Sequence, residues 1–183
     1  PVYRPFHTAV LDQGRVLLTS PLLLQGGRYE IDFDDFERKL QSAKLFILCS
    51  PHNPVGRLWS EAELRQIGQL CQLHDVKVIS DEIHADLAYD GVKAYSLAAL
   101  DDFADITLCC LSPAKSFNLA GLASAVVLVK NPSLRQPLAT AIEKYHLYMG
   151  NSFGIEATIA AYRDSDAWLK ELLAYLQGNR DFL

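Results

Sequence analysis

DITLCCLSPAKSFNLAG, residues 105–121, is the stretch on which the interpretation of the whole sequence depends. Its apolar first half, which runs to Leu111, is typical of a strand buried inside a sheet. A single lysine, Lys115, follows Ser112-Pro113. Ligands of open α/β sheets gather at the carboxyl ends of strands, and a lysine shielded from water there can act as nucleophile or base. Lys115 is therefore a candidate catalytic residue, although a lone lysine in a loop is more often a solvated surface residue.

Short apolar runs alternate with amphipathic segments along the rest of the chain. The pattern predicts strands over residues 16–24, 44–49, 76–80, 105–111 and 123–129, and helices over residues 33–41, 60–74, 131–149, 152–163 and from 166 onward. A capping box at Ser60–Glu63 and the pair Asn131-Pro132 mark two of the helix starts. Strands alternating with helices predict one α/β domain over residues 1–183, with a mostly parallel sheet covered by helices on both faces.

The composition narrows the class of protein. The chain has 183 residues, half of them hydrophobic, with a formal net charge of -5. This acidic balance indicates neither a nucleic-acid partner nor an anionic membrane surface, and no apolar run approaches the ~20 residues that cross a bilayer. The four cysteines have no Cys-x-x-Cys spacing, so we expect reduced thiols in a cytoplasmic protein. The chain starts at Pro1, and its single methionine is Met149, so we expect a piece of a longer protein.

Polar residues with distinct chemistry follow two other predicted strands. Asn53 lies in SPHNPVGRLW, residues 50–59, and Asp81 and His84 lie in DEIHADL, residues 81–87. Because parallel strands end at one edge of a sheet, we expect these side chains to meet Lys115. Each has a plainer interpretation: Asp81 as a turn residue or helix cap, Asn53 as a loop former before Pro54, and His84 as a satisfied polar residue. A cis bond at Asn53-Pro54 is also expected.

These segments, taken together with Pro1-Val2-Tyr3 and Pro5-Phe6, resemble the fold-type I pyridoxal-phosphate enzymes. Within that group they are most similar to the cystalysin and cystathionine β-lyase-like C–S lyases, a branch beside the class I/II aminotransferases. The similarity runs along essentially the whole chain, and the order and spacing of the motifs make it specific. Such enzymes are roughly twice this length. The resemblance therefore implies the central part of a large, cofactor-binding domain, without its N-terminal segment and the C-terminal small domain.

The resemblance implies a role for each matching residue. Lys115 matches the lysine that binds pyridoxal phosphate covalently, and Asp81 matches the carboxylate that faces the pyridine nitrogen. Asn53 matches the amide that hydrogen-bonds the phenolic oxygen, and His84 lies where a second ring contact is expected. Two further roles are carried over, with Ser112 as a hydroxyl donor to the cofactor phosphate and Tyr3 as an aromatic ring over the pyridine; near the end of the chain, Tyr3 could also be a core residue.

Two positions depart from the pattern of the related enzymes. Ala114 stands where a serine usually precedes the lysine, and Ala123 stands where related aminotransferases carry an arginine that faces the phosphate. An alanine at the second position is common in the lyase branch. The chain therefore supplies one hydroxyl and one cation fewer to the phosphate.

The resemblance implies a C–S β-lyase that acts on cystathionine, cysteine or similar S-substituted amino acids, as a homodimer with sites at the interface. The discriminating feature is His84, because aminotransferases usually place a tyrosine three residues after the aspartate. Two alternatives stay open at this point. One is an aminotransferase on the same scaffold, and the other is a non-catalytic fragment or a regulatory relative that binds partners.

Overall fold

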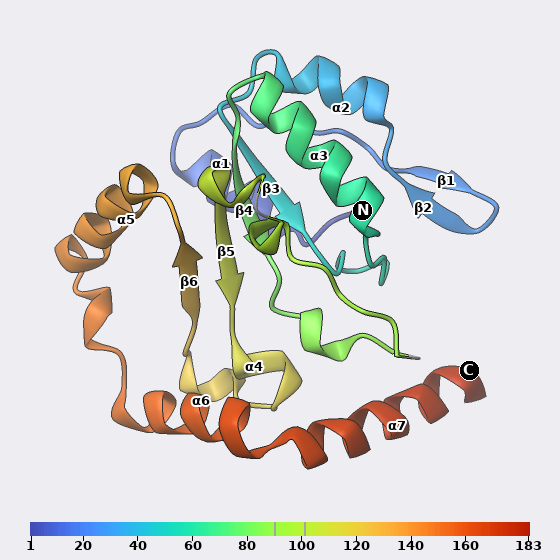
Figure 1. Cartoon of the computed structure of the whole chain (residues 1–183), viewed down its shortest axis with the longest axis vertical. Helices are drawn as coiled ribbons and strands as arrows, with labels where there is room; N and C mark the ends of the chain where they lie inside the picture. Colours follow the sequence, from blue (N-terminus) through green and yellow to red (C-terminus); the bar gives the residue numbers. More distant parts are fainter. Residues whose placement is uncertain (90, 101) are drawn as a thin grey trace.

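A four-stranded sheet forms the centre of the chain in a computed structural model that describes residues 1–89, 91–100 and 102–183. Its strand order is β3-β4-β5-β6, with bounds Leu45–Cys49, Lys77–Asp81, Thr107–Leu111 and Val126–Val129. The first three strands are parallel, whereas β6 runs antiparallel to β5 (Figure 1). The predicted α/β class with a mostly parallel sheet is therefore confirmed.

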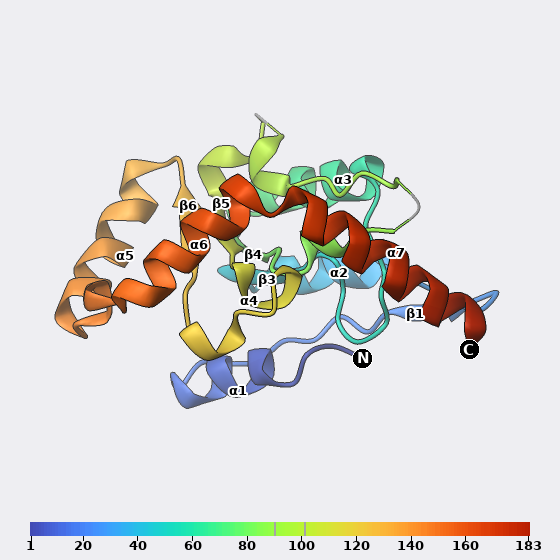
Figure 2. The same ribbon diagram turned by 90° about the horizontal axis from the view of Figure 1, so that it is seen from below.

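Helices lie on both faces of this sheet, as Figure 2 shows with α1 on one side and α3 on the other. The helices that precede β5 in the chain are α1 (Pro5–Asp12), α2 (Phe33–Leu40) and α3 (Glu61–Leu73). Those that follow it are α4 (Pro113–Ser116), α5 (Pro132–Lys144), α6 (Ser152–Asp164) and α7 (Asp166–Phe182). Short 3-10 turns are η1 (Ala85–Leu87), η2 (Leu97–Ala99), η3 (Ala104–Ile106), η4 (Ala120–Leu122) and η5 (Leu147–Met149). Helices α6 and α7 run past the end of the sheet at which β4 and β5 finish (Figure 1).

The core lies between α2, α3 and the sheet. Leu64, Ile67 and Cys71 have no exposed surface, and they form the apolar stripe of α3 that the sequence pattern predicts. The capping box at the start of α3 is confirmed, since Ser60 and Glu63 bond each other's backbone N–H groups. Burial of such apolar side chains is the main favourable term in folding. This part of the molecule therefore supplies the rigid frame on which the strand ends are held.

The predicted strand over residues 16–24 is wrong for most of its length. Only Leu23–Gln25 forms a strand, β1, which pairs with β2 (Arg28–Glu30) in a hairpin closed by Gly26-Gly27. Both glycines have positive φ, as a two-residue hairpin turn requires. Upstream, Val16 is 85% exposed, and Pro21 has no N–H to give to a partner strand. The apolar run at 16–22 therefore stays irregular.

The other differences are at element ends. The expected strands at 105–111 and 123–129 begin later, at Thr107 and Val126, and the expected helix at 131–149 ends as α5 at Lys144. His146 has φ 55°, in the left-handed region, which stops the helix before η5. Over the three described ranges of the chain, no helix combines the length and apolar character needed to cross a membrane.

Candidate functional site

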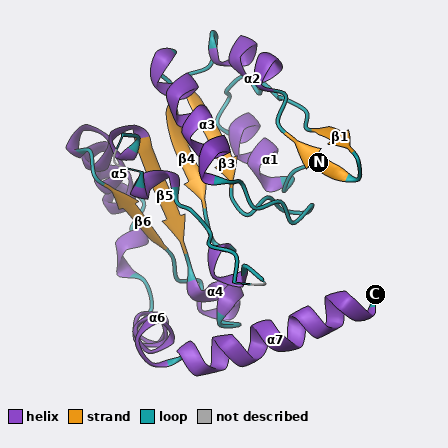
Figure 3. Cartoon of the chain, turned by 45° about the vertical axis from the view of Figure 1, so that its right-hand side comes forward, coloured by secondary structure: helices purple, strands orange, loops and turns teal. Residues whose placement is uncertain are grey.

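The carboxyl ends of the three parallel strands lie level with one another. Cys49, the last residue of β3, pairs in register with Asp81, the last residue of β4, and Asp81 pairs with Cys110 on β5. Figure 3 shows the strands ending together above α4. The segments that carry Asn53, His84 and Lys115 all leave the sheet at this edge, so their side chains are brought into one region.

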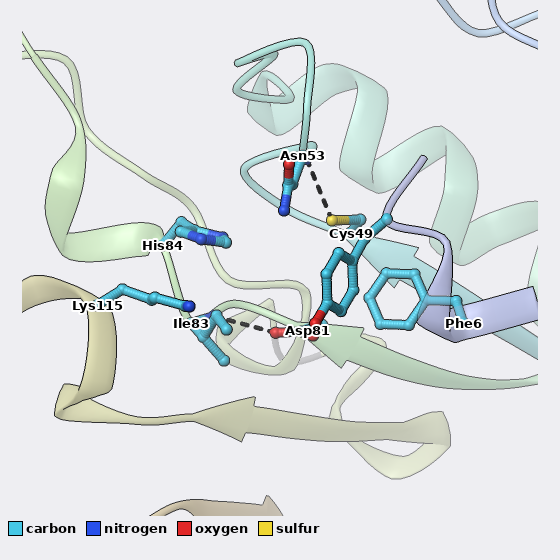
Figure 4. Close-up of a pocket in the computed structure, with 8 residues that line it drawn as sticks. Phe6, Cys49, Asn53, Asp81, Ile83, His84 and Lys115 are labelled. Carbon is cyan, nitrogen blue, oxygen red and sulfur yellow. Dashed lines mark hydrogen bonds between the residues drawn. The ribbon is translucent and has the colours of Figure 1, made fainter. Parts of the chain in front are cut away.

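These side chains line one pocket (Figure 4). It is lined by Tyr3, Phe6, Cys49, Asn53, Asp81, Ile83, His84 and Lys115. Five of the predicted site residues are therefore brought together, namely Tyr3, Asn53, Asp81, His84 and Lys115. The sixth, Ser112, is not among the described residues that line it.

Asp81 presents its carboxylate at the floor of the pocket. One of its oxygens accepts a hydrogen bond of 3.2 Å from the backbone N–H of Ile83, as in an Asx turn (Figure 4). This contact helps to orient the carboxylate. A carboxylate held in this way can pair with a protonated ring nitrogen.

His84 lies near both Asp81 and Lys115, close enough that the charge of each acts on its imidazole. Burial, the largest effect, lowers the pKa of His84; the negative charge of Asp81 raises it, and the positive charge of Lys115 lowers it. The net direction is downward. The imidazole is therefore neutral at neutral pH, so one ring nitrogen is a hydrogen-bond acceptor and the other a donor.

Asn53 projects from a loop that is bound at both ends. Its backbone N–H donates to Cys49 Sγ at 3.4 Å (Figure 4), and the thiol in turn donates to Pro51 O at 3.4 Å. Burial raises the pKa of the Cys49 thiol, which favours the protonated form that can donate. The expected cis bond at Asn53-Pro54 is confirmed, and Ser50-Pro51 is cis as well.

The far end of this loop is fastened by two buried side chains. Arg57 donates to Tyr29 O at 2.6 Å and to Leu58 O at 2.7 Å, and its guanidinium forms an ion pair with Glu63. Trp59 donates its ring N–H to Cys49 O at 2.9 Å. The loop therefore holds the Asn53 amide on the frame made by β3 and α3.

Lys115 lies on α4, a single helical turn, and its side chain extends toward the pocket (Figure 4). The expectation that this lysine is shielded from water is not met within this chain, because the residue is exposed. The amine is therefore placed next to His84 and Asp81, but this chain alone does not enclose it.

Ser112 takes part in the local structure of α4. Its hydroxyl donates to Ser124 O at 2.6 Å and accepts from the backbone N–H of Ala114 at 3.1 Å, which caps the helix. The hydroxyl is thus committed to the turn that carries Lys115. Its predicted contact with a phosphate stays a prediction.

Aromatic rings form one wall of the pocket. Tyr3 and Phe6 meet edge to face with their centroids 5.5 Å apart. Phe6, Cys49 and Ile83 were not predicted as site residues. Their sequence signals are weak: Cys49 and Ile83 adjoin strand ends, and Phe6 and Ile83 lie within segments that carry the resemblance.

The donor set of the pocket fits pyridoxal phosphate. An amine, a carboxylate, an amide and a neutral imidazole stand around one hollow with an aromatic wall, which matches the aldehyde, the ring nitrogen, the phenolic oxygen and the flat ring of that cofactor. In the described part of the chain, no group of three or more histidine, cysteine, aspartate or glutamate residues is arranged to hold a metal ion.

Comparison with known proteins gives the same picture. Residues 1–183 match the sequence profile described as aminotransferase class I and II. The chain is 44% identical over 182 residues to cystathionine beta-lyase PatB of Bacillus subtilis, which covers 98% of this chain and 47% of the relative.

Two solved structures are also similar. The pyridoxal-phosphate-bound C–S lyase from Staphylococcus hominis is 37% identical with a TM-score of 0.92, and covers 100% of this chain and 46% of that one. Cystalysin from Treponema denticola, which contains pyridoxal 5'-phosphate, is 31% identical with a TM-score of 0.90, and covers 100% of this chain and 47% of that one. The chain therefore spans about half the length of the relatives that it matches.

Proposed function

Because the chain belongs to the class I and II aminotransferase family, we propose that its protein is a pyridoxal-phosphate-dependent carbon–sulfur β-lyase. With one molecule of water, it cleaves cystathionine or a similar S-substituted cysteine into a thiol, pyruvate and ammonia. The observation that supports this most directly is the convergence of Lys115, Asp81 and Asn53 around one pocket. The 44% identity to a cystathionine beta-lyase supports the lyase branch.

The chain's own residues would divide the work as follows. Lys115 would hold the cofactor, and its amine would move the proton at the substrate Cα. Asp81 keeps a proton on the pyridine nitrogen, because opposite charges favour each other's charged form. When bound, the protonated pyridine ring supplies an electron sink for the substrate. Loss of the Cα proton then allows a thiolate to leave from Cβ.

The remaining pocket residues orient the ring. Asn53 donates to the phenolic oxygen from a loop that Cys49, Arg57 and Trp59 hold in place. His84 makes a second ring contact, and Tyr3 covers the open face of the ring beside Phe6. Ser112 would contribute a hydroxyl to the phosphate by turning its hydrogen away from Ser124 O. Each of these assignments is part of the proposal.

The proposal extends to the whole protein. The chain is the central part of the cofactor-binding large domain, and the protein is a homodimer in which a partner subunit completes the site. Sedimentation of the full-length protein checks the dimer, and a monomeric active enzyme would contradict it.

The first test is spectroscopic. The full-length protein incubated with pyridoxal phosphate should show a visible absorbance band, and Lys115→Ala should abolish that band. Lys170→Ala, which removes an exposed lysine on α7, is the matched control and should leave the band unchanged. A wild-type protein that stays colourless would overturn the proposed use of the cofactor.

The second test separates lyase from aminotransferase, the activity that gives the family its name. Wild-type protein supplied with cystathionine should release pyruvate and ammonia without an added keto acid. Amino transfer that depends on a keto acid, with no release of pyruvate and ammonia, would replace the lyase with an aminotransferase. Colour without either activity would indicate a binding or regulatory relative.

A further inference from the structure

One side-chain hydrogen bond joins the two segments that carry His84 and Lys115. Ser116, which follows Lys115, donates its hydroxyl to Asp86 Oδ2 at 2.9 Å. Asp86 lies two residues after His84, on η1, and η1 lies close to α4 (Figure 3). The two residues are thirty positions apart in the chain, so the bond is tertiary and not part of a local turn.

Each of these segments is short and has few backbone bonds of its own. Turn η1 has three residues, and its backbone is held by Ala85 N–H to Glu82 O at 2.9 Å and Leu87 N–H to His84 O at 3.0 Å. Helix α4 has four residues, the minimum for one turn. Elements this short are weakly ordered by themselves, because few bonds are made for each residue fixed.

Loss of the Ser116–Asp86 hydrogen bond should carry a large free-energy cost. Ser116 has no exposed surface, whereas Asp86 is half-buried and carries a charge. Hydrogen bonds to a charged group are stronger than those between neutral groups, and a buried partner left without its bond keeps the full cost of its lost hydration. The negative charge of Asp86 also reaches Tyr162 on α6, whose pKa is raised first by burial and then by Asp86.

We propose that Asp86 and Ser116 are positioning residues that hold Lys115 at a set distance from His84 and so tune the binding of pyridoxal phosphate. This inference rests on the proposed function. Neither residue lines the pocket, so each acts through its neighbour in the chain. The motif DEIHADL would then have three roles. Asp81 pairs with the ring nitrogen, His84 contacts the ring, and Asp86 positions the helical turn that carries Lys115 through its bond to Ser116.

The test uses the full-length protein and four variants: Ser116→Ala, Asp86→Ala, Asp86→Asn and the double variant with alanine at both positions. Two quantities are measured, namely the Kd for pyridoxal phosphate and the pH midpoint of the visible band. We expect each alanine variant to bind the cofactor about tenfold more weakly and to shift the midpoint, as loss of a hydrogen bond to a charged group implies. Asp86→Asn keeps an acceptor oxygen but loses the charge, so it should weaken binding less than Asp86→Ala does.

The double variant separates positioning from general loss of stability. If the pair acts as one unit, the double variant binds no more weakly than either single variant. Ser60→Ala is the matched control, because Ser60 also donates to a carboxylate, that of Glu63 at 2.8 Å, but at the start of α3. It should lower the unfolding midpoint without moving the pH midpoint of the band.

Each result decides between the two claims. Wild-type protein without a visible band overturns the proposed function and this inference with it. A wild-type band combined with unchanged Kd and pH midpoint in Asp86→Ala and Ser116→Ala overturns the positioning role alone. So does simple addition of the two effects in the double variant. If Ser116→Ala does not fold, the comparison of Asp86→Ala with Asp86→Asn still decides, since equal effects of the two would contradict the role of the acceptor.

Discussion

The surroundings of His84 in the pocket set the protonation state of its imidazole. Burial and the nearby Lys115 lower its pKa more than Asp81 raises it. A neutral imidazole can accept a hydrogen bond from a ring substituent, whereas an imidazolium would repel the Lys115 ammonium. The charge state of His84 is therefore tied to the same two residues that are proposed to hold the cofactor.

The shift at His84 predicts a pH dependence of stability. The unfolded chain takes up a proton on histidine near pH 6.5, whereas folded His84 stays neutral until the pH is lower. The unfolded state therefore binds more protons, and the free energy of unfolding falls as the pH drops below about 6.5. His84→Gln should reduce this fall.

Urea unfolding of the cofactor-free protein at about pH 7.5 and pH 5.5 measures the effect. His52 has a pKa lowered mainly by burial as well, so the slope should be reduced and not abolished. His52→Gln combined with His84→Gln should reduce it further. An equal slope in wild type and His84→Gln would show that the pocket does not hold His84 neutral.

Part of the candidate site could be predicted at this scale, and part could not. Asn53, Asp81 and Lys115 each follow a strand end inside a motif, so the topology of a parallel sheet brings them together. The partner of Ser112 was beyond prediction. Its hydroxyl donates to the backbone carbonyl of Ser124. Ser124 comes directly after Ala123, which has φ 47° in the left-handed region. An alanine gives no reason to expect that conformation, so the path of the chain to Ser124 could not be predicted.

At the scale of elements, α3 illustrates packing that a glycine permits. A Cβ on Gly68 would lie 2.5 Å from the ring of Phe103, which is itself buried beside α3. In a helix a glycine costs about 1 kcal/mol relative to alanine. Here the close approach of the ring outweighs that cost, because an atom at 2.5 Å must push the ring aside.

Gly68→Ala should therefore destabilise the protein by about 1–3 kcal/mol, as overpacking of a core does. Gly178→Ala on α7 is the matched change, since a Cβ there meets nothing within 4 Å. It should raise stability by up to about 1 kcal/mol. Urea unfolding midpoints measure both. A Gly68→Ala protein as stable as wild type would show that the ring of Phe103 can move at little cost.

The elements differ in how well the sequence predicts them. Helix α3 is marked by its cap and its apolar stripe, which are local signals. The strand prediction for residues 16–24 was wrong at its start because a strand also needs a partner strand to pair with. Residues around Val16 are apolar in sequence, but Val16 is exposed and belongs to no sheet strand of the described chain. The antiparallel direction of β6 likewise depends on the path of the whole chain and not on Val126–Val129 themselves.

At the scale of the whole molecule, burial is unevenly distributed. The described core residues come from α2, α3, β3, β4, the loop residue Trp59, Val76 just before β4, and Leu97, Leu100 and Phe103. By contrast, α5 and α7 have no buried residue, and α6 has only Gly154 and Ala161. The last two helices therefore depend on few contacts with the rest of the chain. Phe117 makes two ring–ring contacts with them, because its ring meets Tyr162 edge to face and stacks on Trp168. In addition, Arg180 on α7 lies over the Tyr89 ring at 5.5 Å.

Phe117 thus connects the end of the proposed lysine segment with α6 and α7. Its ring is 9% exposed, with centroids 5.4 Å from Tyr162 and 6.0 Å from Trp168. Phe117→Ala should destabilise the protein by about 3–5 kcal/mol, since a large ring is removed from a packed site. Because this ring packs against α6 and α7, amide hydrogen exchange in residues 152–182 should accelerate more than exchange in α3.

Phe182→Ala is the control variant. Its ring is 90% exposed, so the substitution should change stability by less than about 0.5 kcal/mol. Equal acceleration in α3 and α7 would mean that Phe117 stabilises the molecule as a whole, and that the last two helices are held by other side chains.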